Sequence, residues 1–399
     1  MEAVRRRILL VAPFAPAAAG RHGGARALHG LIGELARRHD VVLLHLDVGE
    51  LDPALAERCA AVHVVRVADP GRWGVRARGA VAFARGVSLK AAASAVPLLR
   101  RRVSELTRTV SPGVVQVEFG YLGDALGGVR GPLRVVTLHD PAATLGESLA
   151  LRDDGLPFVH HADARVALRE ERRVLARADA AVVFSERDRE VVARTAPAGA
   201  ELVTIPLGWD VPAAASDPAG HDPPTLLFVG NFVHPPNVDA ALTLATRILP
   251  LVRAEHPDIR LEVVGANPPP VLRALASDHI DVTGEVESVA PYLDRAALVV
   301  VPIALGGGMR VKLLEALGAG KAVVASTRAA EGIATVSGTH LVVTDGDALT
   351  AAAVSRLLAS GAARRRLGGS ARAWAVRELS WATMADRYDE LYDRHERRA

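Results

Sequence analysis

The sequence has little cysteine, few aromatic residues and no long apolar run, and each shortage excludes a class of protein. Cys59 is the single cysteine among 399 residues, so no disulfide can form within the chain, which suits a reducing compartment. Aromatic residues make up 4% of the chain and no basic run is interleaved with them, so the stacking surfaces of single-stranded nucleic-acid binders are missing. No apolar stretch reaches the ~18 residues that a membrane-spanning helix needs. We therefore expect a cytoplasmic protein that binds no nucleic acid and lies at most at the inner face of a membrane.

The size of the chain and its apolar content predict two domains. Half of its residues are apolar, and a typical domain runs to about 100–200 residues, so there is material for two separate cores. The net charge is only +3, and the arginine clusters at 5–7, 100–102 and 364–366 are typical of solvated helix ends. We expect a monomer or a homodimer.

Short β-branched runs alternate with helix-length segments along the chain. Continuous apolar runs of this length predict strands that are buried on both faces, as in parallel sheets. Seven runs precede a segment rich in proline and alanine, and six follow it. The runs are 8–11, 41–44, 62–67, 114–117, 135–138, 181–184 and 202–205, then 226–229, 261–264, 280–282, 298–301, 322–325 and 341–343.

This alternation predicts an α/β protein of two doubly wound, Rossmann-like domains. We expect domains at 1–205 and 225–375, a linker at 206–224, and a C-terminal helix at 376–399 that packs back on the first domain. Ligands of open α/β sheets bind at the carboxyl ends of the strands, so we expect the site in a cleft that the two domains face.

A glycine-rich segment follows the run 298–301 and precedes an amphipathic helix. Gly306, Gly307 and Gly308 let backbone N–H groups approach an anion, and the helix N-terminus adds roughly half a positive charge. Arg310 offers a planar fork of donors. A diphosphate fits this pattern, although a simple glycine turn fits it too.

The helix after these glycines adds two candidate side chains. Lys312 supplies a point charge in the first turn, and Glu315 lies three residues later on the same face, where it can accept hydrogen bonds from ribose hydroxyls. The segment Gly318 to Lys321 imitates a P-loop, but Ala322 follows it in place of the magnesium-binding serine or threonine. The sequence Asp345 to Asp347 predicts a loop turn rather than a metal site. We expect no metal and no cofactor.

The first half of the chain has further candidates at predicted strand ends. Gly23 and Gly24 precede the first helix, where backbone donors can meet the same diphosphate. His139 and Asp140 follow the run 135–138, at the end of a parallel strand where ligands bind. A histidine there can hydrogen-bond a sugar hydroxyl, although a lone histidine is as often structural.

Three residues after the run 114–117 are candidates for contacts with an acceptor. They are Glu118, Phe119 and Tyr121, which follow another predicted strand end in the same domain, and Asp140 is a fourth candidate for the acceptor.

Several motifs occur in an ordered series between residues 13 and 332. They are Pro13 with Gly23-Gly24; Ile205 to Asp210, similar to IPNGVD; Phe228 to Asn231 with Pro236 to Ala241; Val282 to Val286 with Pro291 to Leu293; Gly306 to Glu315; and Gly320 to Ala325 with Glu331-Gly332. The series resembles the retaining GT-B glycosyltransferases of family 4, in a polysaccharide-type branch with the pattern GGGxRxKxxE.

The resemblance implies a first domain that binds the acceptor and a second that binds a nucleoside-diphosphate sugar. By that resemblance the donor diphosphate contacts Gly23, Gly24, Gly307, Gly308, Arg310 and Lys312, the ribose contacts Glu315, the base lies near Gly230, Gly284, Glu285 and Val286, and His139 contacts the donor sugar. His139, Arg310 and Lys312 are the expected catalytic residues.

The chain departs from the family at two places. Gly307 stands where the family has the first of two glutamates, and Asn231 and Asn237 stand where an arginine and a lysine are common. Neutralisation of the phosphates would then depend more on Arg310 and Lys312.

The expected reaction is metal-independent transfer of a sugar to an acceptor hydroxyl with retention of anomeric configuration. An NDP-sugar epimerase or a phosphorylase on the same fold, and a non-catalytic nucleotide-sugar-binding partner of another transferase, are the alternatives. The acceptor class stays open among a glycan, a lipid-linked sugar and a natural product.

Overall fold

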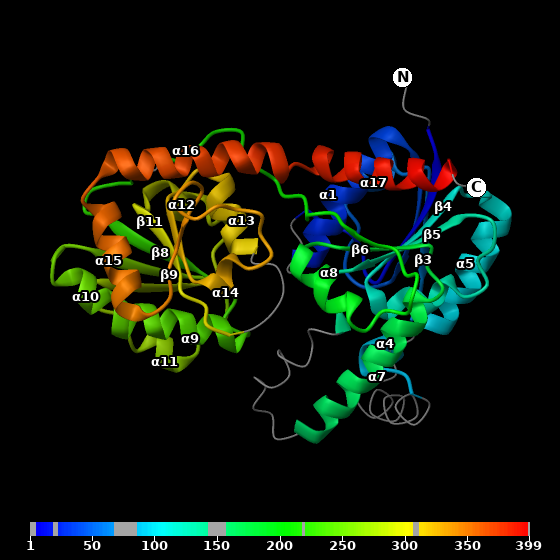
Figure 1. The fold of residues 1–399 in the computed structure, drawn as a ribbon, viewed down its shortest axis with the longest axis horizontal. Helices are drawn as coiled ribbons and strands as arrows, with labels where there is room; N and C mark the ends of the chain where they lie inside the picture. The colour runs from blue at the N-terminus through cyan, green and yellow to red at the C-terminus, as the bar shows by residue number, and fades with distance from the viewer. Residues whose placement is uncertain are drawn as a thin grey trace. The chain divides into compact units, whose positions relative to one another are not determined.

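The computed structural model describes residues 5–18, 23–67, 86–142, 157–217, 220–305 and 311–397. The chain divides into two units, of which unit 1 is Met1–Gly208 with Trp381–Ala399 and unit 2 is Trp209–Ser380. Each unit has one parallel sheet between helices (Figure 1). The predicted pair of Rossmann-like domains is confirmed, and every predicted apolar run overlaps a strand.

Unit 1 contains a seven-stranded parallel sheet in the order β3-β2-β1-β4-β5-β6-β7. The strands are β1 (Arg7–Ala12), β2 (Asp40–Leu46), β3 (Ala61–Val65), β4 (Val114–Glu118), β5 (Leu133–Leu138), β6 (Ala180–Val183) and β7 (Leu202–Thr204). The helices are α1 (Gly23–Arg38), α2 (Pro53–Arg58), α4 (Leu89–Ala93), α5 (Val96–Val110), the 3₁₀ helix η1 (Gly120–Leu126), α7 (Pro157–Leu175), α8 (Glu186–Ala193) and α17 (Trp381–Glu396). The order reverses between β1 and β4, which is where a doubly wound sheet binds its ligand.

Helix α1 forms because its apolar residues recur at helical spacing, and Leu28, Leu31 and Leu35 are buried. The sequence predicts its start after the glycine pair, whereas the structure begins it at Gly23 and so includes both glycines in the first turn. Helix α17 lies beside α1 (Figure 1). A Cβ atom on Gly30 would lie 2.1 Å from the Trp381 ring, so the two helices need this glycine to approach closely.

Ion pairs and hydrogen bonds hold α17 on unit 1. The side chain of Arg6 is 5% exposed and donates to Glu396 at 2.8 Å and to Asp393. The imidazole Nε2 of His39 lies 2.6 Å from Asp389. These contacts confirm that the C-terminal helix packs on the first domain.

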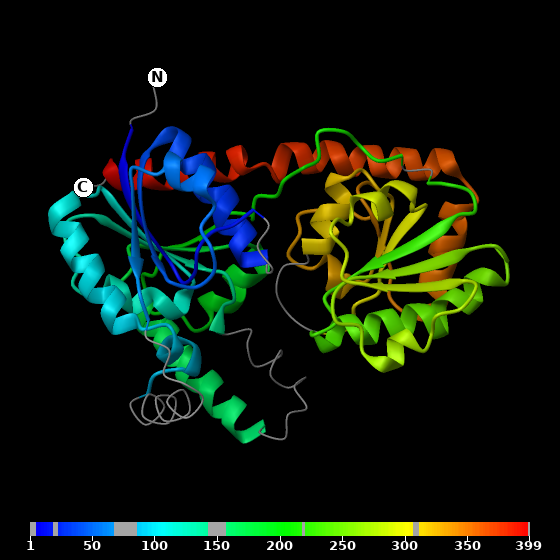
Figure 2. The ribbon, with the colours of Figure 1, turned by 180° about the vertical axis from the view of Figure 1, so that it is seen from behind.

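Unit 2 contains a six-stranded parallel sheet in the order β10-β9-β8-β11-β12-β13. The strands are β8 (Thr225–Val229), β9 (Arg260–Val264), β10 (Ile280–Gly284), β11 (Leu298–Val301), β12 (Val323–Ala325) and β13 (Val342–Val343). The helices are α9 (Pro235–Thr243), the π-helical turn η2 (Leu244–Ile248), α10 (Leu249–Arg253), α11 (Pro270–Arg273), α12 (Ala290–Arg295), α13 (Val311–Gly318), α14 (Thr327–Ala330), α15 (Asp347–Leu358) and α16 (Gly361–Glu378). Helices α9 and α10 cover one face of the sheet, and α13 and α16 lie on the other (Figures 1 and 2).

The predicted C-terminal helix at 376–399 covers the end of α16 and the whole of α17. Trp374 belongs to α16 and joins the core of unit 2, whereas α17 belongs to unit 1, and Leu379 and Ser380 separate the two. Among the described helices, none combines the length and the apolar character that crossing a bilayer requires.

Candidate functional site

The predicted donor segment begins after β11 and continues into α13. Gly307, Gly308 and Arg310 lie outside the residues that the structure describes. Helix α13 begins at Val311, so Lys312 and Glu315 occupy its first two turns, both half-buried. Leu314 and Leu317 on the opposite side pack into the core of unit 2, which fixes the face that carries Lys312.

The ammonium group of Lys312 contacts residues of α9 and β8. Its Nζ donates to the side-chain oxygen of Asn237 in α9, and it lies 5.0 Å from the centre of the Phe228 ring at the end of β8. Asn237 in turn donates to the carbonyl of Asn231 at 2.7 Å. Asn237, which stands where the family has a cation, thus contacts Lys312 in the structure.

Three glycines meet where the neighbouring strands β8, β9 and β10 end. The Gly230 N–H donates to the Val264 carbonyl at 2.9 Å, and the Gly265 N–H donates to the Gly284 carbonyl at 3.0 Å. A Cβ atom on Gly265 would lie 1.8 Å from the Gly230 oxygen, and its φ of 142° also demands glycine. Two residues predicted near the base, Gly230 and Gly284, are therefore brought together by Gly265, which the sequence analysis missed.

The other two residues predicted near the base diverge after Gly284. Glu285 is exposed, whereas Val286 packs partly against the core of unit 2. Gly284 has a φ of 89° and open space around its Cα, so the chain turns there without a steric cost.

The segment Gly318 to Lys321, which imitates a P-loop, has a structural role. Helix α13 ends at Gly318, and Gly320 follows with a φ of 79°, so these glycines terminate a helix instead of opening one as a P-loop does. Lys321 is completely buried and donates to the carbonyl oxygens of Asp217 and Asp294.

The Asp345 to Asp347 segment forms a turn before α15. Asp345 accepts hydrogen bonds from the N–H and hydroxyl of Thr327, and Asp347 pairs with Arg247. Gly346 between them has a φ of 86°, which is typical of such a turn.

In unit 1, aromatic rings gather where four adjacent strands end. Phe14, Phe119, His139 and Phe184 follow β1, β4, β5 and β6 within two residues. His139 stacks on Phe119 with 3.8 Å between ring centres, and it meets the edge of Phe184 at 4.8 Å. The chain has seven phenylalanines, of which Phe119 and Phe184 contact this histidine, and Phe14 meets Phe119 edge to face at 5.4 Å. Sequence analysis missed Phe14, three residues after the predicted run 8–11, and Phe184, the last residue of the predicted run 181–184.

The imidazole of His139 is fixed by a buried carboxylate. Its Nε2 lies 2.7 Å from Oε2 of Glu118, whose side chain is completely buried. Phe119, the next residue, has a φ of 72°, a strained value for a residue with a side chain. This strain turns the chain at the end of β4 so that Glu118 and Phe119 both contact the same ring.

Two more acceptor candidates lie together at the edge of this cluster. The Lys90 ammonium is 3.9 Å from Asp140 and 5.9 Å from the centre of the Tyr121 ring. Burial, together with the charge of Asp140, raises the pKa of Tyr121 and keeps its hydroxyl protonated. The side chain of Glu171 accepts from the Ala142 N–H at 2.6 Å and so anchors the loop after His139.

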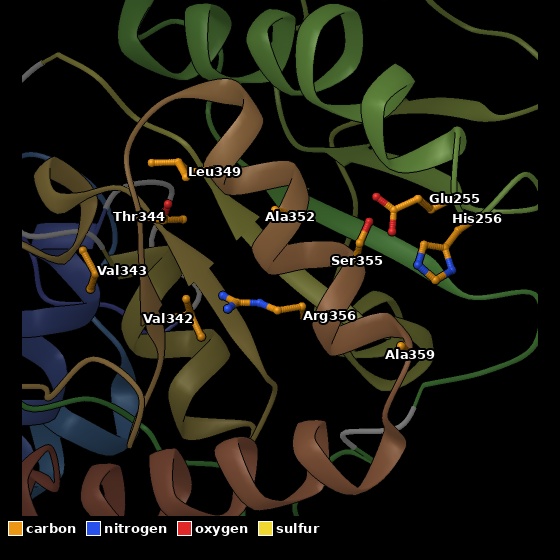
Figure 3. A pocket seen from close by; sticks show the side chains of 10 residues that line it. All are labelled: Glu255, His256, Val342, Val343, Thr344, Leu349, Ala352, Ser355, Arg356 and Ala359. Atoms are coloured by element: carbon orange, nitrogen blue, oxygen red, sulfur yellow. The ribbon is translucent and has the colours of Figure 1, made fainter.

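A separate hollow of about 580 Å³ lies along α15 in unit 2. In Figure 3, Arg356 extends from α15 toward Val342, and Glu255 and His256 lie across the helix from them. None of the residues predicted for the donor site lines this hollow, so it is not part of the candidate site.

Comparisons with known proteins concern unit 2 and the fold of the chain. Residues 223–360, within unit 2, match the family model described as "Glycosyl transferases group 1". No curated protein sequence matches the chain.

Solved structures share the fold over nearly the whole chain. A sucrose-phosphate synthase from Thermosynechococcus elongatus aligns with a TM-score of 0.73 and 19% identity over 99% of this chain and 100% of its own. HepE of Anabaena, in complex with UDP and glucose, aligns with a TM-score of 0.67 and 14% identity over 98% and 100%. A putative UDP-N-acetylglucosamine 2-epimerase from Listeria monocytogenes aligns with a TM-score of 0.57 and 11% identity over 99% and 98%.

Proposed function

We propose that the protein is a glycosyltransferase that moves a sugar from a nucleoside-diphosphate sugar to an acceptor hydroxyl. The observation that carries the proposal is the match of residues 223–360 to glycosyl transferases group 1, because the segment contains Lys312 in the first turn of a helix after a central strand. A cation at that place suits a diphosphate. The similar Anabaena structure holds UDP and glucose, which supports the same kind of donor for this chain.

Each part of the sugar donor is bound by residues of matching chemistry. Lys312, with Arg310 and the amides of Gly307 and Gly308, holds the diphosphate, where negative charge develops as the bond to the sugar breaks. Glu315 accepts hydrogen bonds from the ribose. His139 binds a hydroxyl of the donor sugar.

The remaining predicted residues complete the binding of donor and acceptor. The base binds where β8 and β10 end, at Gly230 and Gly284, with Glu285 and Val286. Gly23 and Gly24 at the start of α1 supply backbone donors to the diphosphate. Phe119, Tyr121 and Asp140 contact the acceptor. No carboxylate acts as a nucleophile and no metal takes part, so the acceptor hydroxyl attacks from the face that the diphosphate leaves, and configuration is retained.

A panel of donors tests the proposal directly. Purified protein is mixed with UDP-glucose, GDP-mannose or dTDP-glucose, and binding is followed by isothermal titration calorimetry. We expect one donor to bind, and Lys312→Ala to weaken it about 10- to 100-fold, the value of a hydrogen bond to a charged group. Arg365→Ala is the matched control, because it removes an exposed cation from the same unit.

Product analysis separates transfer from the alternatives. A transferase releases the free nucleotide slowly from the donor when no acceptor is present, whereas an epimerase converts the donor into a second NDP-sugar. A non-catalytic partner binds the donor and leaves it intact. The fold alone does not distinguish these classes, since a putative epimerase shares it.

A further inference from the structure

Polar side chains interrupt the sheet face that β4 and β5 turn toward α17. Alternate residues of a strand point to the same face, so Gln116 and Glu118 lie on one face of β4, and the sheet register pairs Glu118 with Thr137 of β5. All three side chains are completely buried. Buried polar groups are costly unless they are hydrogen-bonded, so their partners can be accounted for one by one.

Two chains of hydrogen bonds lead from α17 to a single oxygen of Glu118. The Thr137 hydroxyl donates to Oε1 of Glu118 at 3.0 Å, so its only proton is used and the Tyr388 hydroxyl, 3.0 Å away, must donate to it. The Gln116 amide donates to the same Oε1 at 2.6 Å, and the Tyr392 hydroxyl donates to the Gln116 oxygen.

The two tyrosines are suited to act as donors. Both side chains are completely buried, and burial raises the pKa of Tyr388 and of Tyr392 well above its ordinary value, so both hydroxyls keep their protons. Each chain therefore runs from a phenol of α17 to Oε1 of Glu118, which accepts the last hydrogen bond of both chains.

The second oxygen of Glu118 determines which nitrogen of His139 carries a proton. Oε2 lies 2.7 Å from Nε2, and a carboxylate that only accepts requires a proton on that nitrogen. Phe119 stacks on the ring with an interplanar angle of 12°, so the plane of the imidazole is fixed as well. Nδ1 is then the nitrogen that can meet a substrate.

We propose that Glu118 is a positioning residue, which holds His139 with its Nε2 protonated and presents Nδ1 to the substrate, and that Tyr388 and Tyr392 hold Glu118. The role of Nδ1 rests on the proposed function, because that function gives His139 its sugar contact. The sequence analysis had placed Glu118 among the acceptor contacts, but a fully buried carboxylate with both oxygens bonded serves His139 instead.

The variant Glu118→Gln should change which nitrogen of His139 carries the proton. The amide oxygen of the new glutamine stays with the two donors at the Oε1 position, so its NH₂ group points at His139. Nε2 must then accept, and the imidazole proton moves to Nδ1. A substitution of nearly equal size thus exchanges the two nitrogens of His139, which a packing role alone would not do.

Nitrogen-15 NMR of histidine-labelled protein at pH 8 reports the proton on each ring nitrogen. The His139→Asn spectrum identifies the signals of His139 among the 14 histidines. We expect a proton on Nε2 in the wild type and on Nδ1 in Glu118→Gln. The exposed carboxylate of Glu105 supplies the matched control, Glu105→Gln, which should leave the wild-type pattern unchanged. A wild-type Nε2 without a proton overturns the proposal, and this test needs no variant of Glu118 to fold.

Kinetics with the donor that binds among UDP-glucose, GDP-mannose and dTDP-glucose give a second readout. Glu118→Gln should lower kcat about 10- to 100-fold, the cost of leaving a buried polar group without its hydrogen-bond partner, and change the donor KM less than about twofold. An unchanged kcat in a variant whose tautomer has switched would contradict the role of Nδ1. If the wild type turns over no donor, the proposed function fails, whereas the NMR result still decides how Glu118 holds His139.

Discussion

Replacing Gly265 by alanine should destabilise unit 2 and disturb the strand ends near the predicted base site. A new Cβ would lie 1.8 Å from the carbonyl oxygen of Gly230, whereas ordinary van der Waals contacts begin at 3.4 Å. The obstacle is backbone, so no side-chain rotation can relieve it. The φ of 142° adds conformational strain, because side chains disfavour that region.

The two costs can be separated with a second glycine. A positive φ costs an alanine about 1–2 kcal/mol, and overpacking costs about 1–3 kcal/mol more, so Gly265→Ala should lose about 2–5 kcal/mol of unfolding free energy. Gly338 has a φ of 81° and open space around it, so Gly338→Ala should lose only the first part.

Urea unfolding followed by tryptophan fluorescence measures both variants, since Trp209 and Trp374 report on unit 2. With a slope of about 2 kcal/mol per molar, the midpoint should fall by about 1–2.5 M for Gly265→Ala and by less than about 1 M for Gly338→Ala. Equal midpoints for the two variants would refute the close approach of the two backbones.

Three further predictions concern packing and charge. Arg6→Ala removes the bonds to two carboxylates of α17 and should cost about 1–3 kcal/mol in thermal unfolding, whereas exposed Arg365→Ala should cost less than about 0.5 kcal/mol. Gly30→Ala pushes a Cβ into the Trp381 ring and should lower the melting temperature by several degrees, about 1–3 kcal/mol. Burial lowers the pKa of Lys321 from 10.5 to about 8, so above pH 8 the unfolded chain binds a proton that the folded chain releases. Stability relative to Lys321→Met should therefore rise from pH 8 to 10.5, by at most about 3 kcal/mol, and a constant urea-midpoint difference would contradict this sign.

Much of the fold can be predicted from the sequence because parallel strands are buried on both faces. Each strand is a short continuous apolar run, and even the brief β13 contains part of the predicted run 341–343. The final helical stretch was harder, since nothing local marks Leu379 and Ser380 as the place where the chain returns to unit 1. That return depends on Trp381 meeting Gly30, a contact between distant residues.

Residues of the candidate site could be predicted where they belong to a local motif. They were missed where their contacts depend on the order of the strands in the sheet. His139 directly follows β5, and Lys312 lies in the first turn of the helix after the glycine-rich segment, so position along the chain was enough to select both. Nothing in the local sequence marks Gln116, Thr137 or Tyr388 as part of a site. Their hydrogen bonds form only because β4 pairs with β5 and α17 packs over these strands. The sheet order also explains Phe184, which joins His139 only because β5 and β6 are neighbours.

The central claim is that unit 2 binds the diphosphate of a sugar donor through Lys312. The most direct test is calorimetric titration of wild type, Lys312→Ala and Arg365→Ala with UDP-glucose, GDP-mannose and dTDP-glucose. The account predicts that one donor binds the wild type and the Arg365 variant equally, and the Lys312 variant about 10- to 100-fold more weakly. Binding of that donor to Lys312→Ala with wild-type affinity, or to none of the three proteins, would contradict it.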